Sequence, residues 1–198
     1  WFNNENINAI DLPQKFSIDF NKFLEMRYGE NPHQKAAFYK TNDPRIGIAT
    51  SNQLQGKELS YNNINDGNAA YELICEFNQP AIAIIKHANP CGVAENANIN
   101  LAWEKALQTD PISAFGGIVA LNRELTLDLA KQMKSLFLEV IIAPSFTNEA
   151  LKIFKDKPNI RILASGSMPI PQENGLDIKS ISGGMLVQTR DNKVLTRS

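Results

Sequence analysis

A lysine and a histidine stand side by side at the end of an apolar run, and both side chains can handle protons or charge. The run is Ala81 to Ile85, and Lys86 and His87 follow it directly. A histidine exchanges its proton near neutral pH, so it can act as a general base or acid. A lysine that emerges from an apolar strand can stabilise negative charge that develops in a reaction. A solvated lysine beside a histidine that hydrogen-bonds a loop explains the pair equally well when it is taken alone.

The apolar run predicts the strand that positions this pair. Ala81 to Ile85 show no polar alternation, so we expect both faces of the strand to be buried, as in a central parallel strand. Asn89-Pro90 is expected to stop the strand, because proline has no N–H to donate. Open parallel sheets bind ligands beyond the carboxyl ends of their strands, where Lys86 and His87 would then lie. Neighbouring strand residues point to opposite faces, so the two reach one ligand only if the strand has already ended.

Patterns typical of strands and helices alternate along the rest of the chain. Alternation at 16–20 and the apolar segment 36–39 predict two early strands. Helices are expected to start at Asn65 or Asp66, Asn100, Thr126 and Thr147, with later strands at 118–121, 139–143, 160–163 and 183–188. This alternation predicts an α/β fold with a mainly parallel sheet flanked by helices.

The composition limits the kinds of protein that this chain can be. Its 198 residues are 43% hydrophobic, which is enough to bury one sizeable core. Lys and Arg number 20 against 21 for Asp and Glu, so the net charge of -1 gives no general attraction to nucleic acid or to a membrane surface. No apolar run of about 18 residues and no signal-peptide pattern is present, and two cysteines suit a reducing compartment. We therefore expect a cytoplasmic protein.

The cysteines and histidines do not predict a metal site. Zinc-dependent base deaminases carry a proline-cysteine pair and a second cysteine three residues later, and Pro90-Cys91 begins such a pattern. The second position holds Ala94 instead. With two cysteines and two histidines in the whole chain, no zinc site of ordinary ligand spacing can be assembled. Cys75 falls on the apolar face of its predicted helix, which indicates a core position.

Four other stretches carry groups that suit a nucleotide. Arg27-Tyr28-Gly29 joins a planar cation, which suits phosphate, to an aromatic ring and a permissive glycine, although a structural ion pair is the alternative. Ser60 to Asn63 can read a base or carboxamide edge, or can simply form a turn. The glycine turn from Ser113 to Gly117 lets a ligand approach backbone amides. Glu139 is either an edge charge or an inward acceptor, and spacing does not decide between them.

Five segments of the chain form a series that is far more specific than any single motif. They are Arg27-Tyr-Gly-Glu-Asn-Pro-His-Gln34, Leu59-Ser-Tyr-Asn-Asn63 with Asp66, Lys86-His-Ala-Asn-Pro-Cys-Gly92, Asp110-Pro-Ile-Ser-Ala-Phe-Gly-Gly117 and Glu139-Val-Ile-Ile-Ala-Pro144. Taken in this order, they resemble the AICAR transformylase/IMP cyclohydrolase family of purine biosynthesis, specifically its transformylase region. The resemblance covers roughly Phe16 to the end of the chain.

The resemblance implies a cytidine-deaminase-like fold without the zinc site, in which a three-layer α/β/α sandwich surrounds a mixed, mostly parallel sheet. The transformylase region of the family has two related halves, and this chain would supply the first. Residues 1–15 would be a linker or arm left from the preceding cyclohydrolase domain, and residues 16–198 the first transformylase subdomain. The second subdomain is absent, and an opening on Trp1 rather than methionine agrees with a piece of a longer protein.

The implied reaction belongs to de novo purine biosynthesis. It transfers a formyl group from 10-formyltetrahydrofolate to the 5-amino group of the ribonucleotide AICAR, giving FAICAR, which the whole protein would close to IMP in a domain absent here. Lys86 and His87 match the catalytic pair, with His87 as general base and Lys86 stabilising the oxyanion. Arg27 would meet the phosphate and Glu139 the carboxamide. The substrate-binding positions that the resemblance implies are Arg27, Tyr28, Gly29, Asn63, Phe115, Gly116 and Glu139.

The resemblance also implies partners and a limit. The whole protein would be a homodimer that needs no metal, and most of its folate pocket would come from the second half, largely across the dimer interface. Because those parts are missing, we expect the isolated chain to be inactive. The alternative is a non-catalytic nucleotide-binding or assembly module. A nucleic-acid-binding role has little support, because the charge is balanced and no aromatic-basic pattern is present.

Overall fold

The computed structural model describes residues 12–42, 44–169 and 173–193, so residues 1–11 of the predicted arm lie outside the described residues. The chain divides into two compact units, of which the larger is Phe20–Pro169. The smaller unit contains a hairpin of β9 (Leu176–Ile181) and β10 (Gly184–Thr189). The larger unit contains β1 (Asn21–Met26), β2 (Ala36–Lys40), β3 (Asn52–Gln55), α1 (Tyr61–Cys75), β4 (Ala81–Lys86), β5 (Asn89–Glu95), α2 (Ile99–Thr109), β6 (Gly117–Leu121), α3 (Leu127–Met133), β7 (Leu138–Ala143), α4 (Asn148–Phe154) and β8 (Arg161–Ala164).

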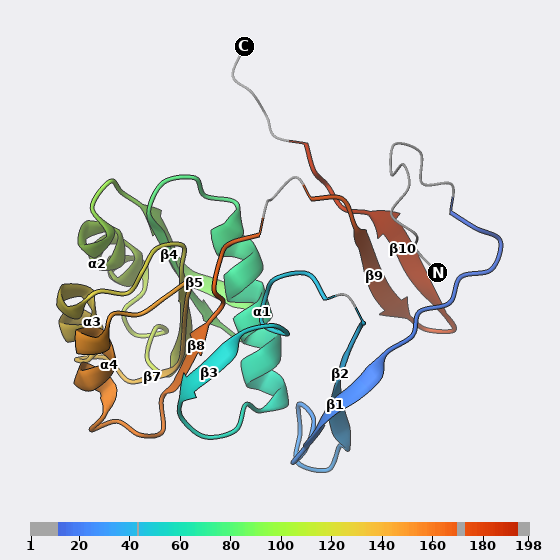
Figure 1. Ribbon diagram of the computed structural model, residues 1–198, viewed down its shortest axis with the longest axis horizontal. Helices are drawn as coiled ribbons and strands as arrows, with labels where there is room; N and C mark the ends of the chain where they lie inside the picture. The colour runs from blue at the N-terminus through green and yellow to red at the C-terminus, as the bar shows by residue number, and fades with distance from the viewer. Residues whose placement is uncertain (1–11, 43, 170–172, 194–198) are drawn as a thin grey trace. The chain divides into compact units, whose positions relative to one another are not determined.

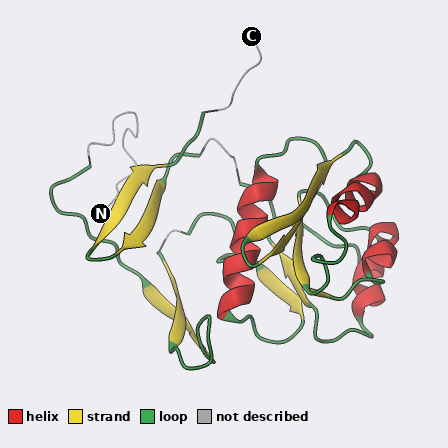
Figure 2. Ribbon diagram, turned by 180° about the vertical axis from the view of Figure 1, so that it is seen from behind, coloured by secondary structure: helices red, strands yellow, loops and turns green. Residues whose placement is uncertain are grey.

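A six-stranded sheet with the order β3-β8-β7-β6-β4-β5 forms the centre of the larger unit. Helix α1 covers one face of this sheet, and α2, α3 and α4 cover the other (Figure 1). The view from behind shows the same layers, with the long helix α1 alone on its side (Figure 2). The predicted three-layer α/β/α sandwich is therefore confirmed.

Strand β4 shows how residue alternation builds both halves of the core. Ile82 and Ile84 pack among residues of α2, α3 and α4, whereas Ala83 and Ile85 pack against α1. None of these four side chains is more than 1% exposed. Fully burying an isoleucine side chain contributes about 1.5–3 kcal/mol, so a strand covered on both faces is stabilised by an uninterrupted apolar run. The predicted two-sided burial of this strand is confirmed.

The sheet is mixed, and β4 runs against both of its neighbours. The pairs β6–β7 and β7–β8 are parallel, whereas β3–β8, β4–β6 and β4–β5 are antiparallel. Because β5 and β6 both oppose β4, the four strands β5 to β8 share one direction, as a mixed and mostly parallel sheet requires. The prediction that β4 is a central parallel strand is wrong. An apolar run indicates covered faces and carries no information on the direction of neighbouring strands.

The chain turns back after Lys86 instead of leaving the sheet. Lys86 pairs with Asn89 across a two-residue turn made of His87 and Ala88, and β5 begins at Asn89. The prediction that Asn89-Pro90 stops the strand pattern is therefore wrong, because these residues start the next strand. Proline is tolerated there because β5 is the edge strand, where a missing N–H need not remove a ladder hydrogen bond.

Helix α1 begins earlier than predicted. Ser60 is its N-cap, because the Ser60 hydroxyl oxygen accepts from the Asn63 N–H and Asn63 Oδ1 accepts from the Ser60 N–H. This capping box satisfies two backbone donors near the helix start. Asn65 and Asp66, the predicted caps, lie inside the helix. The consequence for the site is that Asn63 and Asp66 both project from a formed helix rather than from a loop.

The remaining differences concern short or exposed segments. Residues 16–20 alternate as a strand would, but among the described residues they have no ladder partner, and β1 begins at Asn21. Strands β3 and β9 were not expected, since β3 is a largely exposed edge strand with no apolar alternation and β9 is also largely exposed. Helix α2 is capped by Asn98 rather than by Asn100. In the smaller unit, β10 pairs antiparallel with β9, so the predicted last strand is confirmed.

A side chain at Gly92 is expected to break the contact between β5 and α2. A Cβ there would lie 1.9 Å from the Ala106 carbonyl oxygen, which is a backbone atom of α2. We expect Gly92→Ala to lower the free energy of unfolding by at least about 2 kcal/mol, because the helix has to shift. Urea denaturation followed by circular dichroism measures this loss.

Gly67→Ala is the matched control. Its Cβ would lie 3.5 Å from Ile142 Cδ1, an ordinary contact, and alanine is favoured over glycine inside a helix by about 1 kcal/mol. We expect Gly67→Ala to keep or raise the stability. Equal stabilities for the Gly92→Ala protein and the wild type would contradict the packing of β5 on α2.

Candidate active site

Most of the candidate residues meet at one end of the central sheet, where β4 ends and its neighbours begin; Arg27, Tyr28 and Gly29 lie in a separate loop. Because β4 is antiparallel to β6, its carboxyl end, Lys86, lies beside the amino end of β6, where Ile85 pairs with Ile118. The parallel strands β7 and β8 begin at the same end of the sheet, and Val140 pairs with Arg161 there. The expected location at the carboxyl ends of parallel strands is therefore wrong. Only β4 contributes its carboxyl end, and β6, β7 and β8 contribute their amino ends.

Lys86 is held against the glycine turn that precedes β6. Its ammonium Nζ donates to the Phe115 carbonyl oxygen at 2.9 Å. Gly116 has a φ of 72°, which glycine adopts at little cost, and its N–H donates to the Phe137 carbonyl oxygen at 2.8 Å. The rings of Phe115 and Phe137 lie 5.2 Å apart, and both are about half exposed. The structure thus brings Lys86, Phe115 and Gly116 together beside a small aromatic surface.

His87 is fixed through its backbone. His87 and Ala88 have φ values of 53° and 56°, the left-handed region that costs a residue with a Cβ about 1–2 kcal/mol. The carboxylate of Asp66 accepts from both backbone N–H groups at 3.0 Å, Oδ2 from His87 and Oδ1 from Ala88. The Asn89 side chain donates to the His87 carbonyl oxygen at 2.7 Å. The turn is therefore tied down from two sides, while the His87 side chain stays exposed.

Asn63 and Glu139 form a second cluster at this end of the sheet. Asn63 is 3% exposed, and its Nδ2 donates to Glu139 Oε2 at 2.8 Å. Arg161, whose side chain is 17% exposed, approaches the same oxygen at 3.9 Å. Both contacts involve Oε2, and 44% of the Glu139 side chain remains exposed. Glu139 can therefore accept an amide N–H from a ligand while it is held from behind.

Helix α1 connects these groups. Asn63 and Asp66 are three residues apart, so they lie on one side of the helix, and they reach β7 and the β4–β5 turn respectively. The side chain of Asn62 donates to the Glu30 carbonyl oxygen at 3.4 Å, which joins the loop after β1 to the start of the same helix. The first turns of α1 thus contact three separate parts of the larger unit.

Arg27, Tyr28 and Gly29 lie in the loop after β1. The Arg27 guanidinium carbon is 5.7 Å from the Tyr28 ring centroid, and Arg27 is exposed. The Gly29 N–H donates to the Gln34 carbonyl oxygen at 2.9 Å, which closes the loop. Among the described residues, no hydrogen bond or ion pair joins Arg27 to Lys86 or to the β4–β5 turn. The structure therefore brings this loop to the start of α1, but it leaves Arg27 without a partner at the catalytic pair.

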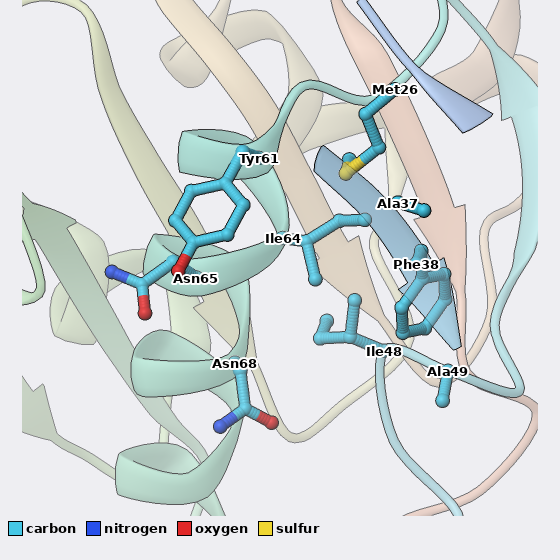
Figure 3. A pocket seen from close by; sticks show the side chains of 9 residues that line it. All are labelled: Met26, Ala37, Phe38, Ile48, Ala49, Tyr61, Ile64, Asn65 and Asn68. Carbon is cyan, nitrogen blue, oxygen red and sulfur yellow. The ribbon is translucent and has the colours of Figure 1, made fainter. Parts of the chain in front are cut away.

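An open cavity of about 320 Å³ lies between the β1–β2 hairpin and α1 (Figure 3). None of the catalytic or substrate-binding positions implied by the family resemblance lines it, although Tyr61 of the Ser60–Asn63 segment does. Met26 connects the two regions in sequence, because it lines the cavity and directly precedes Arg27. The lining residues are Met26, Ala37, Phe38, Ile48, Ala49, Tyr61, Ile64, Asn65 and Asn68.

The chemistry of the nearby cysteine does not favour thiolate or metal ligation. Burial raises the pKa of the Cys91 thiol, and the Asp110 carboxylate raises it further. The side-chain hydroxyl of Ser113 donates a hydrogen bond to the Asp110 carboxylate and is the largest cause of its lowered pKa, and the Ser113 backbone N–H adds a second hydrogen bond. This carboxyl therefore stays ionised near Lys86. In the described part of the chain, no three His, Cys, Asp or Glu side chains gather as metal ligands would. No helix in the described ranges has the length and apolar content to cross a membrane.

The arrangement can transfer a proton and stabilise charge beside a planar polar ligand. The His87 imidazole is exposed at the turn and can take a proton, and the Lys86 ammonium can exchange its carbonyl partner for a developing oxyanion. Glu139 supplies an acceptor for an amide group. Phe115 and Phe137 supply apolar ring surface.

Three residues at this end of the sheet were not predicted to contribute to the site. Asp66 stands in one of the segments that carry the family resemblance, but its spacing from Lys86 along the chain gives no hint of contact. Phe137 stands two residues before the predicted strand 139–143, and an aromatic residue near a strand end is a weak signal. Arg161 becomes recognisable only from the register of β7 on β8, where it pairs with the residue after Glu139.

The fold and the site together define an α/β/α domain that presents a lysine–histidine pair and an amide-accepting carboxylate at one end of its central sheet. The chain belongs to the AICARFT/IMPCHase bienzyme family, whose model matches residues 1–198. The family resemblance predicted from five sequence segments is thereby confirmed.

Curated relatives match nearly the whole chain. The bifunctional purine biosynthesis proteins PurH of Chelativorans sp. (strain BNC1), Rhizobium leguminosarum bv. trifolii (strain WSM2304) and Bradyrhizobium diazoefficiens are 57%, 56% and 52% identical to it. The alignments cover 94%, 93% and 98% of this chain but 35%, 35% and 37% of the relatives. This chain therefore spans about a third of their length. A solved structure from Desulfotalea psychrophila covers 59% of this chain and 47% of its own at 14% identity and a TM-score of 0.35, and no conclusion rests on that likeness.

Removing the buried Asn63 side chain is expected to destabilise the larger unit. Asn63→Ala deletes one half of the capping box and the donor to Glu139, so we expect a loss of about 1–3 kcal/mol in the free energy of unfolding. Chemical denaturation measures the loss. Asn68→Ala is the control, because Asn68 is exposed on the same helix and alanine is the better helix former.

A double-mutant cycle with Glu139→Ala isolates the side-chain pair. We expect a coupling energy of about 0.5–3 kcal/mol between positions 63 and 139, as is typical of contacting residues. Purely additive effects of the two substitutions would show that the hydrogen bond between them contributes nothing.

Proposed function

We propose that this chain is the first half of a transformylase region and that the whole protein transfers a formyl group from 10-formyltetrahydrofolate to the 5-amino group of AICAR. Residues 1–15 are then a linker from a preceding cyclohydrolase domain, and residues 16–198 are the first transformylase subdomain. The family match and the relatives named as bifunctional purine biosynthesis proteins support this proposal. The observation that carries it is that Lys86 and His87 lie at the same end of the central sheet as Phe115, Gly116 and Glu139.

His87 acts as the general base in the proposed reaction. The AICAR amine is conjugated with its imidazole ring and is a poor nucleophile, so removal of its proton during attack lowers the barrier. A new N–C bond forms at the formyl carbon, and the carbonyl electron pair moves to oxygen. Collapse of this oxyanion breaks the bond to the folate nitrogen, which leaves with a proton.

Lys86 stabilises the oxyanion in this proposal. Its ammonium already donates to a backbone carbonyl oxygen, that of Phe115, at 2.9 Å, and a developing anion is a stronger acceptor than a neutral carbonyl. Stabilisation that grows with the charge lowers the barrier more than it strengthens substrate binding. Lys86 is therefore assigned to the transition state and not to substrate affinity.

The remaining residues bind the nucleotide in this proposal. Glu139, held by Asn63, accepts the carboxamide N–H, and Asn63, Phe115 and Gly116 line the base and ribose. The exposed Arg27 guanidinium, next to Tyr28 and Gly29, binds the phosphate through paired hydrogen bonds. The whole protein works in the cytoplasm as a homodimer without a metal, and the second half of the region completes the folate pocket.

His87→Ala in the full-length protein is expected to lower kcat by about 100- to 10,000-fold, the usual contribution of a positioned general base. The KM for AICAR should change little, because His87 is assigned to proton transfer. Steady-state assays of FAICAR formation measure both constants. Lys131→Ala, at an exposed position on α3, is the control and should behave as the wild type. A His87→Ala protein with near-normal turnover would remove His87 from the mechanism.

The isolated chain is expected to form no FAICAR, because the second half that supplies most of the folate pocket is missing. Incubation of the purified chain with AICAR and 10-formyltetrahydrofolate, followed by product detection, tests this. Turnover by the isolated chain would refute the assignment as a half-site.

Calorimetry separates a preformed half-site from a merely folded module. If the chain binds AICAR, Arg27→Ala should weaken binding by roughly 10- to 100-fold, the value of hydrogen bonds to a charged group. Lys131→Ala should leave binding unchanged. Equal affinities of the Arg27→Ala chain and the unaltered chain would exclude Arg27 as the phosphate ligand.

A further inference from the structure

Asp66 contacts the candidate catalytic turn but has no role in the proposed reaction. It lies on α1, about one helical turn after Asn63 and separated from His87 by the second half of the helix and all of β4. Both carboxylate oxygens are used, because Oδ2 accepts from the His87 N–H and Oδ1 from the Ala88 N–H, each at 3.0 Å. The side chain of Asn65 lies 3.4 Å from Oδ1 as a further donor.

The turn that Asp66 holds is one that its own residues do not favour. Two-residue hairpin turns with positive φ at both central positions usually contain asparagine, aspartate or glycine. Here both positions carry residues outside that set, His87 and Ala88, with φ of 53° and 56°. A conformation of this kind persists only when surrounding contacts impose it. Two hydrogen bonds from one carboxylate are such contacts.

This turn determines how the backbone leaves the strand between Lys86 and His87. Lys86 is the last residue of β4 and reaches the Phe115 carbonyl oxygen, whereas His87 leaves the strand direction because its φ is positive. In a regular strand the two side chains would point to opposite faces. Because the left-handed turn ends the strand alternation after Lys86, the side chains of Lys86 and His87 need not point to opposite faces.

We propose that Asp66 is a positioning residue for formyl transfer, which holds the His87–Ala88 turn so that the imidazole and the Lys86 ammonium meet the same reacting carbon. The inference rests on the proposed function. It assigns Asp66 no contact with substrate and no proton transfer. Asp66 acts through the backbone of His87, from the same helix as Asn63, whose hydrogen bond to Glu139 positions the carboxamide acceptor.

Asp66→Asn in the full-length protein tests the proposal. Asparagine keeps the shape and one acceptor oxygen but replaces the other with a donor, so one of the two backbone hydrogen bonds is lost. We expect kcat to fall by about 10- to 100-fold, as for a small misplacement of reacting groups, while the KM for AICAR changes less than about threefold. Asp128→Asn, an exposed aspartate on α3, is the control and should leave both constants unchanged.

Two further measurements distinguish positioning from general stability. Hydrogen–deuterium exchange in the peptide spanning β4 and β5 should become at least about tenfold faster at His87 and Ala88 in the Asp66→Asn protein, since a lost hydrogen bond removes protection. Adding Ala88→Gly should restore most of the lost turnover, because glycine adopts positive φ without the help of Asp66. A loss of activity through global unfolding would not be rescued in this way.

The outcomes separate this inference from the proposed function. Near-normal turnover of the Asp66→Asn protein, with His87→Ala inactive, would overturn the inference alone. Lost turnover with unchanged exchange at the turn and no rescue by Ala88→Gly would also overturn it, since Asp66 would then act by another route. Near-normal turnover of His87→Ala would overturn the catalytic role of His87 and the inference that rests on it.

Discussion

Burial of both faces of one sheet is the constraint on which the rest of the structure depends. Three helices share one face, but α1 covers the other face alone, so its position is fixed by contacts along its whole length with β4, β6 and β7. The apolar side chains of α1, such as Ile74, are fully buried there. The polar residues at its start therefore have little freedom. Their positions at the end of the sheet are set by the packing of apolar side chains farther along α1.

The site combines two ways of holding polar groups in place. Asn63 is buried, and its side-chain oxygen and nitrogen each make a hydrogen bond, so the bond to Glu139 is made in a poorly solvated setting where an unpaired partner is costly. Lys86 and His87 are more accessible and are fixed through backbone contacts, which leaves the imidazole free for a ligand. A site that must bind and release a polar molecule needs both, a rigid base and reactive groups that solvent and substrate can reach.

Local patterns predicted the layers but not the directions. The apolar run from Ala81 to Ile85 identified a strand with two covered faces. The lysine–histidine pair after it lies at the end of the sheet together with Phe115, Gly116 and Glu139. The same run could not reveal antiparallel pairing, because burial is identical for either direction. The link from Asp66 to His87 and that from Arg161 to Glu139 depend on register and helix placement, which arise only when the chain packs. Ser60 was missed as a cap because several polar residues compete in that segment.

The antiparallel turn after β4 also bears on the order in which the chain can fold. The β4–β5 hairpin closes through two residues, and isolated hairpins of this kind form in about 1–10 μs. The parallel pairs β6–β7 and β7–β8 each require a helical crossover, so they close longer loops and pay more entropy first. Lys86 and His87 thus lie at a local hairpin, whereas Glu139 lies in a strand whose pairings close over much longer loops. One part of the proposed site therefore depends on contacts between residues close in sequence, and the other part depends on contacts between distant residues.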